Sequence, residues 1–187
     1  YFDNSNITND KVQNLYSSLK LSSEKFKILL PGRLTTWKGQ EMFIESLNLL
    51  RAKYNKENFQ AIILGSHQGR KVYFKKLISA VAKYRLRDKV FFLQHIKEMP
   101  IAYYVSDVVV SSSIEPEAFG RISVEAQAMR RPILASNHGG STETIVDGKS
   151  GFLFENNNPE SLAENLNKLI EMDKDKLQSI GNEGRKN

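Results

Sequence analysis

Two glutamates are the side chains in this sequence whose type and spacing most suggest chemistry. Glu117 and Glu125 flank a Phe119-Gly120 turn, where a buried run becomes an amphipathic helix. On one straight helix, their separation at about 1.5 Å per residue would hold the two acids roughly 12 Å apart. The paired acids that hydrolyse glycosides sit about 5 to 9.5 Å apart. We therefore expect these two glutamates to hold two ends of one extended ligand.

A basic pair forms the second candidate cluster. Arg33 and Lys38 lie in the segment 31–39, which follows the first strong apolar run and opens a helix. A helix N-terminus attracts anions through its unpaired N–H groups. Arg33 adds a planar fork suited to phosphate, and Lys38 adds a compact charge. The pattern predicts a diphosphate clamp, against the alternative of two solvated residues in a loop.

The acids and glycines have alternative readings as well. On the helix, Glu125 could accept hydrogen bonds from the vicinal hydroxyls of a ribose, and Glu117 could do the same for a sugar. The alternative makes both of them surface acids, with Glu117 beside the helix dipole. Gly120 would let the backbone approach a ligand closely, and Gly139-Gly140 permit either close approach or a turn with positive φ.

Six short apolar runs that alternate with helical patterns must position these residues. Each run is apolar almost without interruption, as expected for parallel strands covered on both faces. The predicted strands are 26–31, 59–65, 90–94, 108–112, 132–136 and 151–154. Their β-α order predicts an α/β fold with a doubly wound, six-stranded parallel sheet of the Rossmann-like kind. Ligands bind such a sheet at the carboxyl ends of its strands, where the candidate residues fall.

Polar segments flank this predicted domain. Residues 1–25 are expected to form a linker and a short helix around Leu15, and residues 26–172 the Rossmann-like domain. Residues 173–187 are expected to form a polar C-terminal helix that frays. The whole chain of 187 residues is long enough for one substantial core.

The amino-acid composition restricts the kinds of partner that the chain could bind. The formal charge of +6 and the pI near 9.4 call for an acidic partner, whether nucleic acid, anionic lipid or a phosphorylated small ligand. No apolar run approaches the roughly 18 to 20 residues that cross a bilayer. The absence of cysteine excludes disulfides and thiolate metal sites and fits a reducing compartment, so we expect a cytoplasmic protein.

Several sequence motifs that mark other enzyme classes are absent from the sequence. No Gly-x-Gly-x-x-Gly follows a strand and no Gly-Lys-Ser/Thr loop exists, which weighs against dehydrogenases and P-loop enzymes. Asp173 and Asp175 fall in a charged tail with no strand before them and are interpreted as solvated surface, so no metal site is predicted. His67 and His95 are interpreted as polar loop residues without a catalytic role.

Together these residues resemble the donor-binding domain of retaining GT-B glycosyltransferases, the large group 1 family, over about residues 27–170. The motifs that carry the resemblance are Gly32-Arg33-Leu34 with Lys38-Gly39, Glu117-Ala118-Phe119-Gly120 through Glu125-Ala126, Pro132, Gly139-Gly140 with Glu143, and Asp147-Gly148 with Gly151. The amino-acid sequence of residues 115–129 is similar to that of bacterial members that build lipopolysaccharide or other surface polysaccharide.

The resemblance implies a role for each motif residue. Arg33 and Lys38 would hold the diphosphate of a UDP-, GDP- or ADP-sugar and would stabilise the departing nucleotide in place of a metal. Glu125 would bind the ribose hydroxyls, and Glu117 hydroxyls of the transferred sugar. The implied donor contacts also include Gly32, Ile96 against the nucleobase, Ala118, Phe119, Gly120 and Arg121. The sequence departs from the family at Arg130-Arg131, where a small residue and glycine usually precede the proline, so an altered turn is expected there.

The resemblance also implies partners. The family binds a glycan or lipid-linked acceptor through an N-terminal domain that is missing from this sequence, so we expect donor binding without useful transfer. The basic surface could hold the full enzyme peripherally on an anionic membrane, at the inner face of the cytoplasmic membrane. No nucleic-acid partner is expected.

Three other functions stay open. A sugar-nucleotide epimerase of the same fold would convert the donor with no acceptor present. A basic nucleic-acid-binding module is suggested by the charge, but aromatic residues such as Tyr73, Phe74, Tyr84 and Tyr103 mostly fall at core-like spacing. A non-catalytic interaction domain would leave the basic pair and the glutamates without a ligand.

Overall fold

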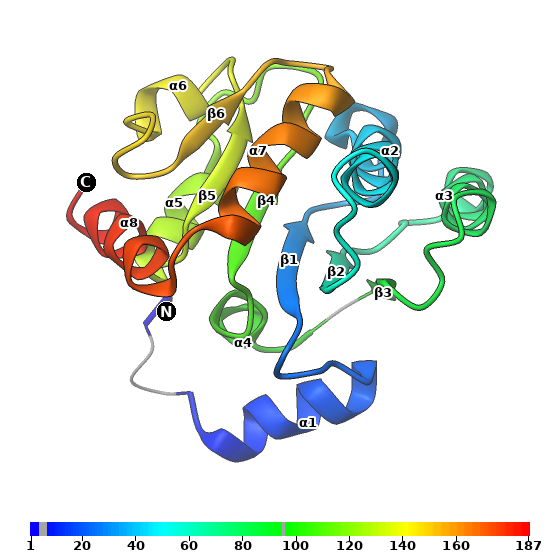
Figure 1. Ribbon diagram of the computed structural model, residues 1–187, viewed down its shortest axis with the longest axis horizontal. Coiled ribbons are helices and arrows are strands. Elements are labelled where there is room, and N and C mark those ends of the chain that lie inside the picture. The colour runs from blue at the N-terminus through cyan, green and yellow to red at the C-terminus, as the bar shows by residue number, and fades with distance from the viewer. Residues whose placement is uncertain (4–6, 95) are drawn as a thin grey trace.

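The computed structural model describes residues 1–3, 7–94 and 96–187, and it contains one parallel sheet of six strands (Figure 1). The strands are β1 (Phe26–Pro31), β2 (Phe59–Leu64), β3 (Val90–Leu93), β4 (Val108–Ser111), β5 (Ile133–Ser136) and β6 (Phe152–Phe154). Their order is β3-β2-β1-β4-β5-β6, which reverses between β1 and β4. The predicted doubly wound sheet is confirmed, and each strand end lies within one residue of its predicted position.

Helices cover both faces of the sheet (Figure 1). They are α1 (Asn9–Leu19), α2 (Gln40–Ala52), α3 (Lys71–Lys83), α4 (Met99–Tyr104), α5 (Arg121–Ala128), α6 (Ser141–Thr144), α7 (Pro159–Glu171) and α8 (Lys174–Lys186), with a 3-10 turn η2 (Thr36–Lys38). Side chains alternate across each strand, so Ile28 and Leu30 join the core under α2, α3 and α7. Leu29 joins the second core, under α1, α4 and α5. Burial on both faces explains the unbroken apolar runs.

The turn between α5 and β5 closes without the expected glycine. Arg130 takes the left-handed conformation with φ 55°, and the Arg131 N–H donates to the Ala126 carbonyl at 2.9 Å. A glycine is favoured at such a position because it has no Cβ. The expected alteration is therefore limited to the side chain, because the backbone turn is formed with arginine.

The polar C-terminal segment forms α8, which packs on α5. A Cβ on Gly181 would lie 2.1 Å from the Arg130 carbonyl oxygen, and one on Gly184 would lie 2.9 Å from Gln127 Cγ. Two positions without side chains thus let the helix approach the α5 turn closely, while Leu177 and Ile180 are buried beside them. No helix within the described ranges is long and apolar enough to span a bilayer.

Candidate functional site

The loop after β1 brings Lys38 to the end of β4. Gly39 ends η2 in the left-handed conformation with φ 71°. A Cβ there would lie 1.9 Å from the Ser112 carbonyl oxygen, so only glycine allows this approach. The Ser112 hydroxyl donates to the Lys38 carbonyl at 3.0 Å, and the Ile114 N–H donates to the Trp37 carbonyl at 2.8 Å. The loops that follow β1 and β4 are thereby joined.

Two of the predicted site residues meet in an ion pair across these loops. Lys38 Nζ lies 2.6 Å from Glu117 Oε1, although the residues are 79 positions apart. The Ser113 hydroxyl donates to the same carboxylate oxygen. The side chains are only 11% and 19% exposed, so the pair is screened little by solvent. Because α5 begins after Glu117, the straight-helix spacing of the two acids does not apply.

Arg33, in contrast, keeps its guanidinium group free. Its backbone carbonyl accepts a hydrogen bond from Gln40 Nε2 at 2.9 Å, which fixes the loop. Its side chain is exposed and makes no hydrogen bond or ion pair with any residue in the described ranges. An unpaired guanidinium beside a desolvated lysine suits a phosphate group, because it presents a fork of N–H donors.

The loop after β5 completes the cluster. The Gly140 N–H donates to the Glu117 carbonyl at 2.7 Å, and His138 Nε2 donates to the Ser113 carbonyl at 2.7 Å. A Cβ on Gly140 would lie 2.5 Å from the Phe119 carbonyl carbon. The close approach of these two loops therefore explains why a glycine is needed at this position. His138 and Ser113 were not predicted as site residues. The run of serines directly after β4 was the available signal for Ser113.

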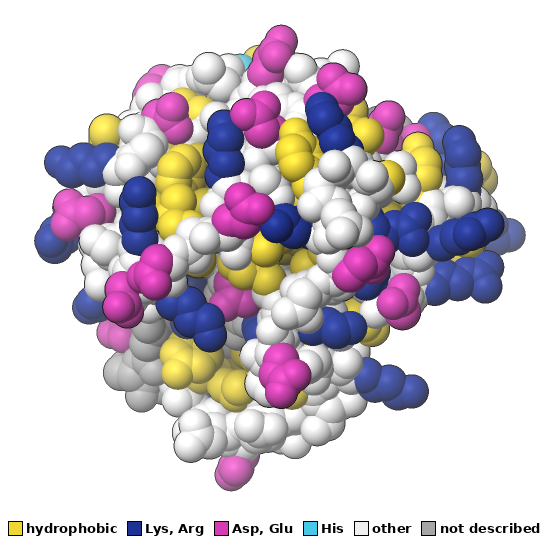
Figure 2. All heavy atoms as spheres, viewed as in Figure 1, with side chains coloured by type: hydrophobic (Ala, Val, Ile, Leu, Met, Phe, Trp, Pro, Cys, Tyr) yellow, Lys and Arg dark blue, Asp and Glu magenta, His cyan; other side chains and the backbone are white. Residues whose placement is uncertain are grey.

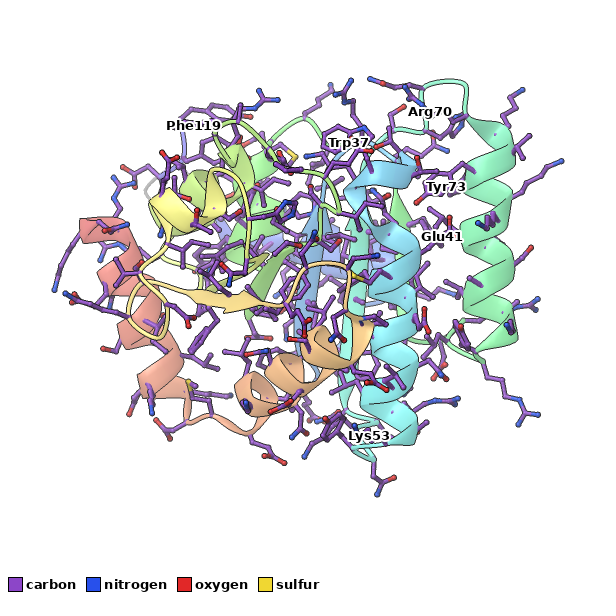
Figure 3. The ribbon with its side chains drawn as sticks, turned by 90° about the horizontal axis from the view of Figure 1, so that it is seen from above. Trp37, Glu41, Lys53, Arg70, Tyr73 and Phe119 are labelled. Carbon is purple, nitrogen blue, oxygen red and sulfur yellow. The ribbon has the colours of Figure 1, made fainter. Side chains whose placement is uncertain are left out.

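The N-terminus of α5 presents unpaired donors beside this cluster. Gly120 has φ 71° and caps the helix, which has no acidic residue in its first turn. Within the described chain, the backbone N–H groups of Gly120, Arg121 and Ile122 donate no hydrogen bond. Ala118, Phe119 and Arg121 are exposed. Figure 3 shows Phe119 and Trp37 along one edge of the molecule, where the loops emerge.

Glu125 lies on α5 and is held by a residue that the sequence did not reveal. The buried Tyr103 hydroxyl donates to Glu125 Oε2 at 2.6 Å. Burial and the negative charge of Glu125 raise the pKa of Tyr103 above its ordinary range, so its hydroxyl stays protonated and donates. The spacing of Tyr103 in the sequence predicted a core aromatic residue, and its ring is indeed buried. Nothing in the sequence indicated that its hydroxyl group would contact Glu125.

Ile96 follows β3, which lies two strands from β1 in the sheet. It is half buried and packs against the second core, and it lines an apolar groove of about 430 Å³ with Leu93 and with Lys11 and Leu15 of α1. Its proposed contact with a nucleobase stays a prediction. His95 lies outside the described residues. Among the described residues, no group of three or more His, Cys, Asp or Glu could hold a metal ion.

Comparison with known proteins defines the class. The sequence profile of "Glycosyl transferases group 1" matches residues 12–187. The chain belongs to this family, and its sheet is the Rossmann-like half of the GT-B fold.

Individual relatives agree with this assignment. The capsular polysaccharide biosynthesis glycosyltransferase CapM of Staphylococcus aureus is 28% identical over 185 residues, which cover 99% of this chain and 46% of CapM. The glycosyltransferase of Rickettsia africae ESF-5 superposes with a TM-score of 0.93 at 31% identity, over 100% of this chain and 48% of its own.

A third similar protein has been crystallised with ligands. Anabaena Alr3699/HepE, solved in complex with UDP and glucose, superposes with a TM-score of 0.87 at 28% identity, over 96% of this chain and 47% of its own. The chain thus spans about half the length of the relatives it matches.

Proposed function

We propose that this chain is the donor-binding half of a retaining glycosyltransferase. The enzyme moves a sugar from a nucleoside-diphosphate sugar to a glycan or lipid-linked acceptor during synthesis of cell-surface polysaccharide. The observation that carries the proposal is the convergence of Arg33, the Lys38–Glu117 pair and the free amides of α5 at the carboxyl edge of β1 and β4. Ligands of doubly wound sheets bind at this switch point.

The pyrophosphate lies against the cations and the helix. Arg33 contributes a bidentate fork, Lys38 contributes the N–H donors of Nζ that Glu117 does not occupy, and the α5 amides add the positive end of a helix dipole. These groups stabilise the negative charge that grows on the nucleotide as the sugar leaves. No residue of this set has to move far, because the loops are already bonded to one another.

The two glutamates accept hydrogen bonds from hydroxyl groups of the donor. In each carboxylate one oxygen is fixed by the protein: Glu117 Oε1 by Lys38 and Ser113, and Glu125 Oε2 by Tyr103. The other oxygen of each has no hydrogen-bond partner among the described residues. Glu117 therefore accepts from the transferred sugar, and Glu125 from the ribose.

Two similarities support the chemistry. HepE, which is similar over nearly the whole chain, was crystallised with UDP and glucose. CapM is a capsular polysaccharide biosynthesis enzyme. Because both relatives are about twice as long as the matched region, we propose that this chain alone binds the donor without transferring its sugar. Conversion of a nucleotide sugar by the chain without an acceptor would instead favour an epimerase.

A thermal-shift panel of UDP, GDP and ADP, with their glucose conjugates, tests the proposal. A ligand that binds only the folded form raises the free energy of unfolding with the logarithm of its concentration over Kd. One nucleotide should raise the Tm of the wild type, and Arg33→Ala should abolish most of that increase.

Arg87→Ala is the matched control, because Arg87 is also exposed and has no hydrogen-bond or ion-pair partner among the described residues. It should keep the full increase in Tm. An increase that survives Arg33→Ala would exclude the clamp.

A further inference from the structure

The excess positive charge of the chain is concentrated in one short segment. Residues 70–87 contain seven of the 27 Lys and Arg residues and none of the 21 Asp and Glu residues. The rest of the chain therefore carries 20 basic and 21 acidic residues and is nearly neutral, although the total formal charge is +6. Figure 2 shows Lys and Arg side chains crowded on the edge of the molecule that α3 forms.

The basic side chains of this segment point away from the protein. On α3, Tyr73, Leu77 and Val81 are buried against the rest of the fold. The exposed basic residues of the segment are Arg70, Lys71, Lys75, Lys76, Lys83, Arg85 and Arg87. Within the described chain only Lys76 among them forms an ion pair, with Glu41 of α2 at 2.6 Å. Their charge is thus left for a partner outside the chain.

Large aliphatic side chains protrude between these cations. Val72 is 85% exposed and Ile78 is 45% exposed, in the same helix as the lysines. Exposed valine and isoleucine within a basic helical surface suit the boundary between headgroups and acyl chains of a bilayer. The lysine stems can extend over such a surface while their ammonium groups meet the phosphates.

A nucleic-acid partner fits this surface less well. Single-stranded nucleic acids stack their bases on exposed aromatic rings. The aromatic residues of α3 face inward instead: Tyr73 is buried and its hydroxyl donates to Gln40 Oε1 at 3.1 Å, and Phe74 packs at the edge of Phe92 with ring centroids 5.3 Å apart. Figure 3 shows Tyr73 between α2 and α3.

We propose that residues 70–87 form a surface that docks on membranes containing anionic phospholipid. Its cations contact the lipid phosphates, and Val72 and Ile78 enter the headgroup layer. The surface begins at Arg70, on the same edge of the molecule as Trp37 (Figure 3). The Leu34 N–H donates to the Ser66 carbonyl at 3.1 Å, which joins the loop before this surface to the loop of Arg33 and Lys38. Docking through this surface would therefore bring the membrane near the loop of Arg33 and Lys38.

Co-sedimentation of the chain with vesicles tests this proposal. One vesicle preparation is phosphatidylcholine alone, and the other includes about one-third phosphatidylglycerol. The wild type should sediment with the anionic vesicles only, and less at high salt, because surface charges are screened. The triple variant Lys71→Gln, Lys75→Gln, Lys83→Gln should lose about tenfold or more in apparent affinity.

A second triple variant, Lys149→Gln, Lys174→Gln, Lys176→Gln, removes the same charge from exposed residues outside this segment. It should bind like the wild type. Equal losses in the two variants, sedimentation with neutral vesicles, or no sedimentation would each overturn the proposal, as would binding to a DNA duplex without binding to vesicles. The Tm increase with the nucleoside diphosphate found in the thermal-shift panel, measured on the same proteins, reports the nucleotide site separately.

Discussion

Two lysine–carboxylate pairs lie at opposite edges of the same sheet. Lys27 enters β1 at the amino edge and faces Asp107 before β4, with Nζ 3.6 Å from Oδ2. Lys38 follows β1 at the carboxyl edge and pairs with Glu117 after β4 at 2.6 Å. The lysine side chains are almost equally hidden, at 6% and 11% exposure. Each pair thus joins the same two strands.

The pairs differ in how completely the ammonium group is used. Lys27 Nζ donates to the carbonyls of Ser22, Ser23 and Lys25, so its hydrogen-bonding capacity is filled by the backbone. Lys38 Nζ donates to one acceptor, Glu117 Oε1, and otherwise lies 4.4 Å from the centre of the Trp37 ring. Among the described residues, Lys38 thus has N–H donors left for the anionic ligand of the proposed function, whereas the donors of Lys27 are used within the fold.

The largest effect should come from Gly39→Ala, which removes the loop geometry that makes the second pair. The new Cβ would meet the Ser112 carbonyl oxygen at 1.9 Å, in a left-handed conformation. We expect a loss of about 3 kcal/mol or more in the free energy of unfolding. Gly69→Ala is the control, because Gly69 has φ 84° and no atom within 4 Å of its Cβ position. Urea denaturation of both variants separates the clash from the backbone strain, and equal losses would contradict the proposed contact.

Exchanging each lysine for methionine tests the comparison itself. Lys27→Met leaves three carbonyls without their donor and Asp107 without its ion-pair partner, although the Lys27 N–H still donates to Asp107 Oδ2 at 2.7 Å. The free energy of unfolding should therefore fall by about 2 kcal/mol or more. The affinity of this variant for the nucleotide that raises the Tm of the wild type should not change. Lys38→Met should also lower the free energy of unfolding, because it leaves the Glu117 carboxylate without its cation. It should lower the affinity for the same nucleotide by about tenfold or more, since it removes a charge-assisted contact. Calorimetry on both variants would contradict the comparison if Lys27→Met lowered the nucleotide affinity as much as Lys38→Met.

Tyr103→Phe should give the smallest effect, and it tests whether Glu125 binds the ribose. The variant keeps the buried ring but removes the hydrogen bond of 2.6 Å to Glu125 Oε2. If Tyr103 positions the ribose acceptor, affinity for the nucleotide that raises the Tm should fall by about fivefold, while affinity for its 2′-deoxy form should hardly change. A purely structural role would weaken both nucleotides equally. Calorimetric Kd values for the two nucleotides distinguish these outcomes.

Much of the fold could be predicted because it depends on local pattern. Continuous apolar runs marked every strand, and Gly139-Gly140 marked a position of close approach or positive φ: Gly139 has φ 57°, and a Cβ on Gly140 would meet Phe119. The packing of α8 was not predicted, because its close approach depends on two glycines, Gly181 and Gly184, inside a segment that is polar in sequence.

As with the fold, the parts of the site that depend on local sequence motifs could be predicted, and the contacts between distant residues could not. Arg33, Lys38 and Glu117, which the family resemblance named, lie in loops that follow β1 and β4, whereas Ile96 lines a groove beside α1. Their ligand contacts stay predictions. The contacts of Ser113, His138 and Tyr103 with the site join residues from different loops and helices. Side-chain geometry of this kind is set by the packing of distant elements, and one sequence carries no record of it.

A crystal structure of this chain with the nucleoside diphosphate that raises its Tm is the most direct test of the central claim, that Arg33 and Lys38 bind a pyrophosphate. The account predicts the two phosphates within hydrogen-bonding distance of the Arg33 guanidinium, Lys38 Nζ and the α5 amides, with the ribose at Glu125. A nucleotide bound elsewhere, or at this edge with both basic side chains turned away from its phosphates, would contradict it.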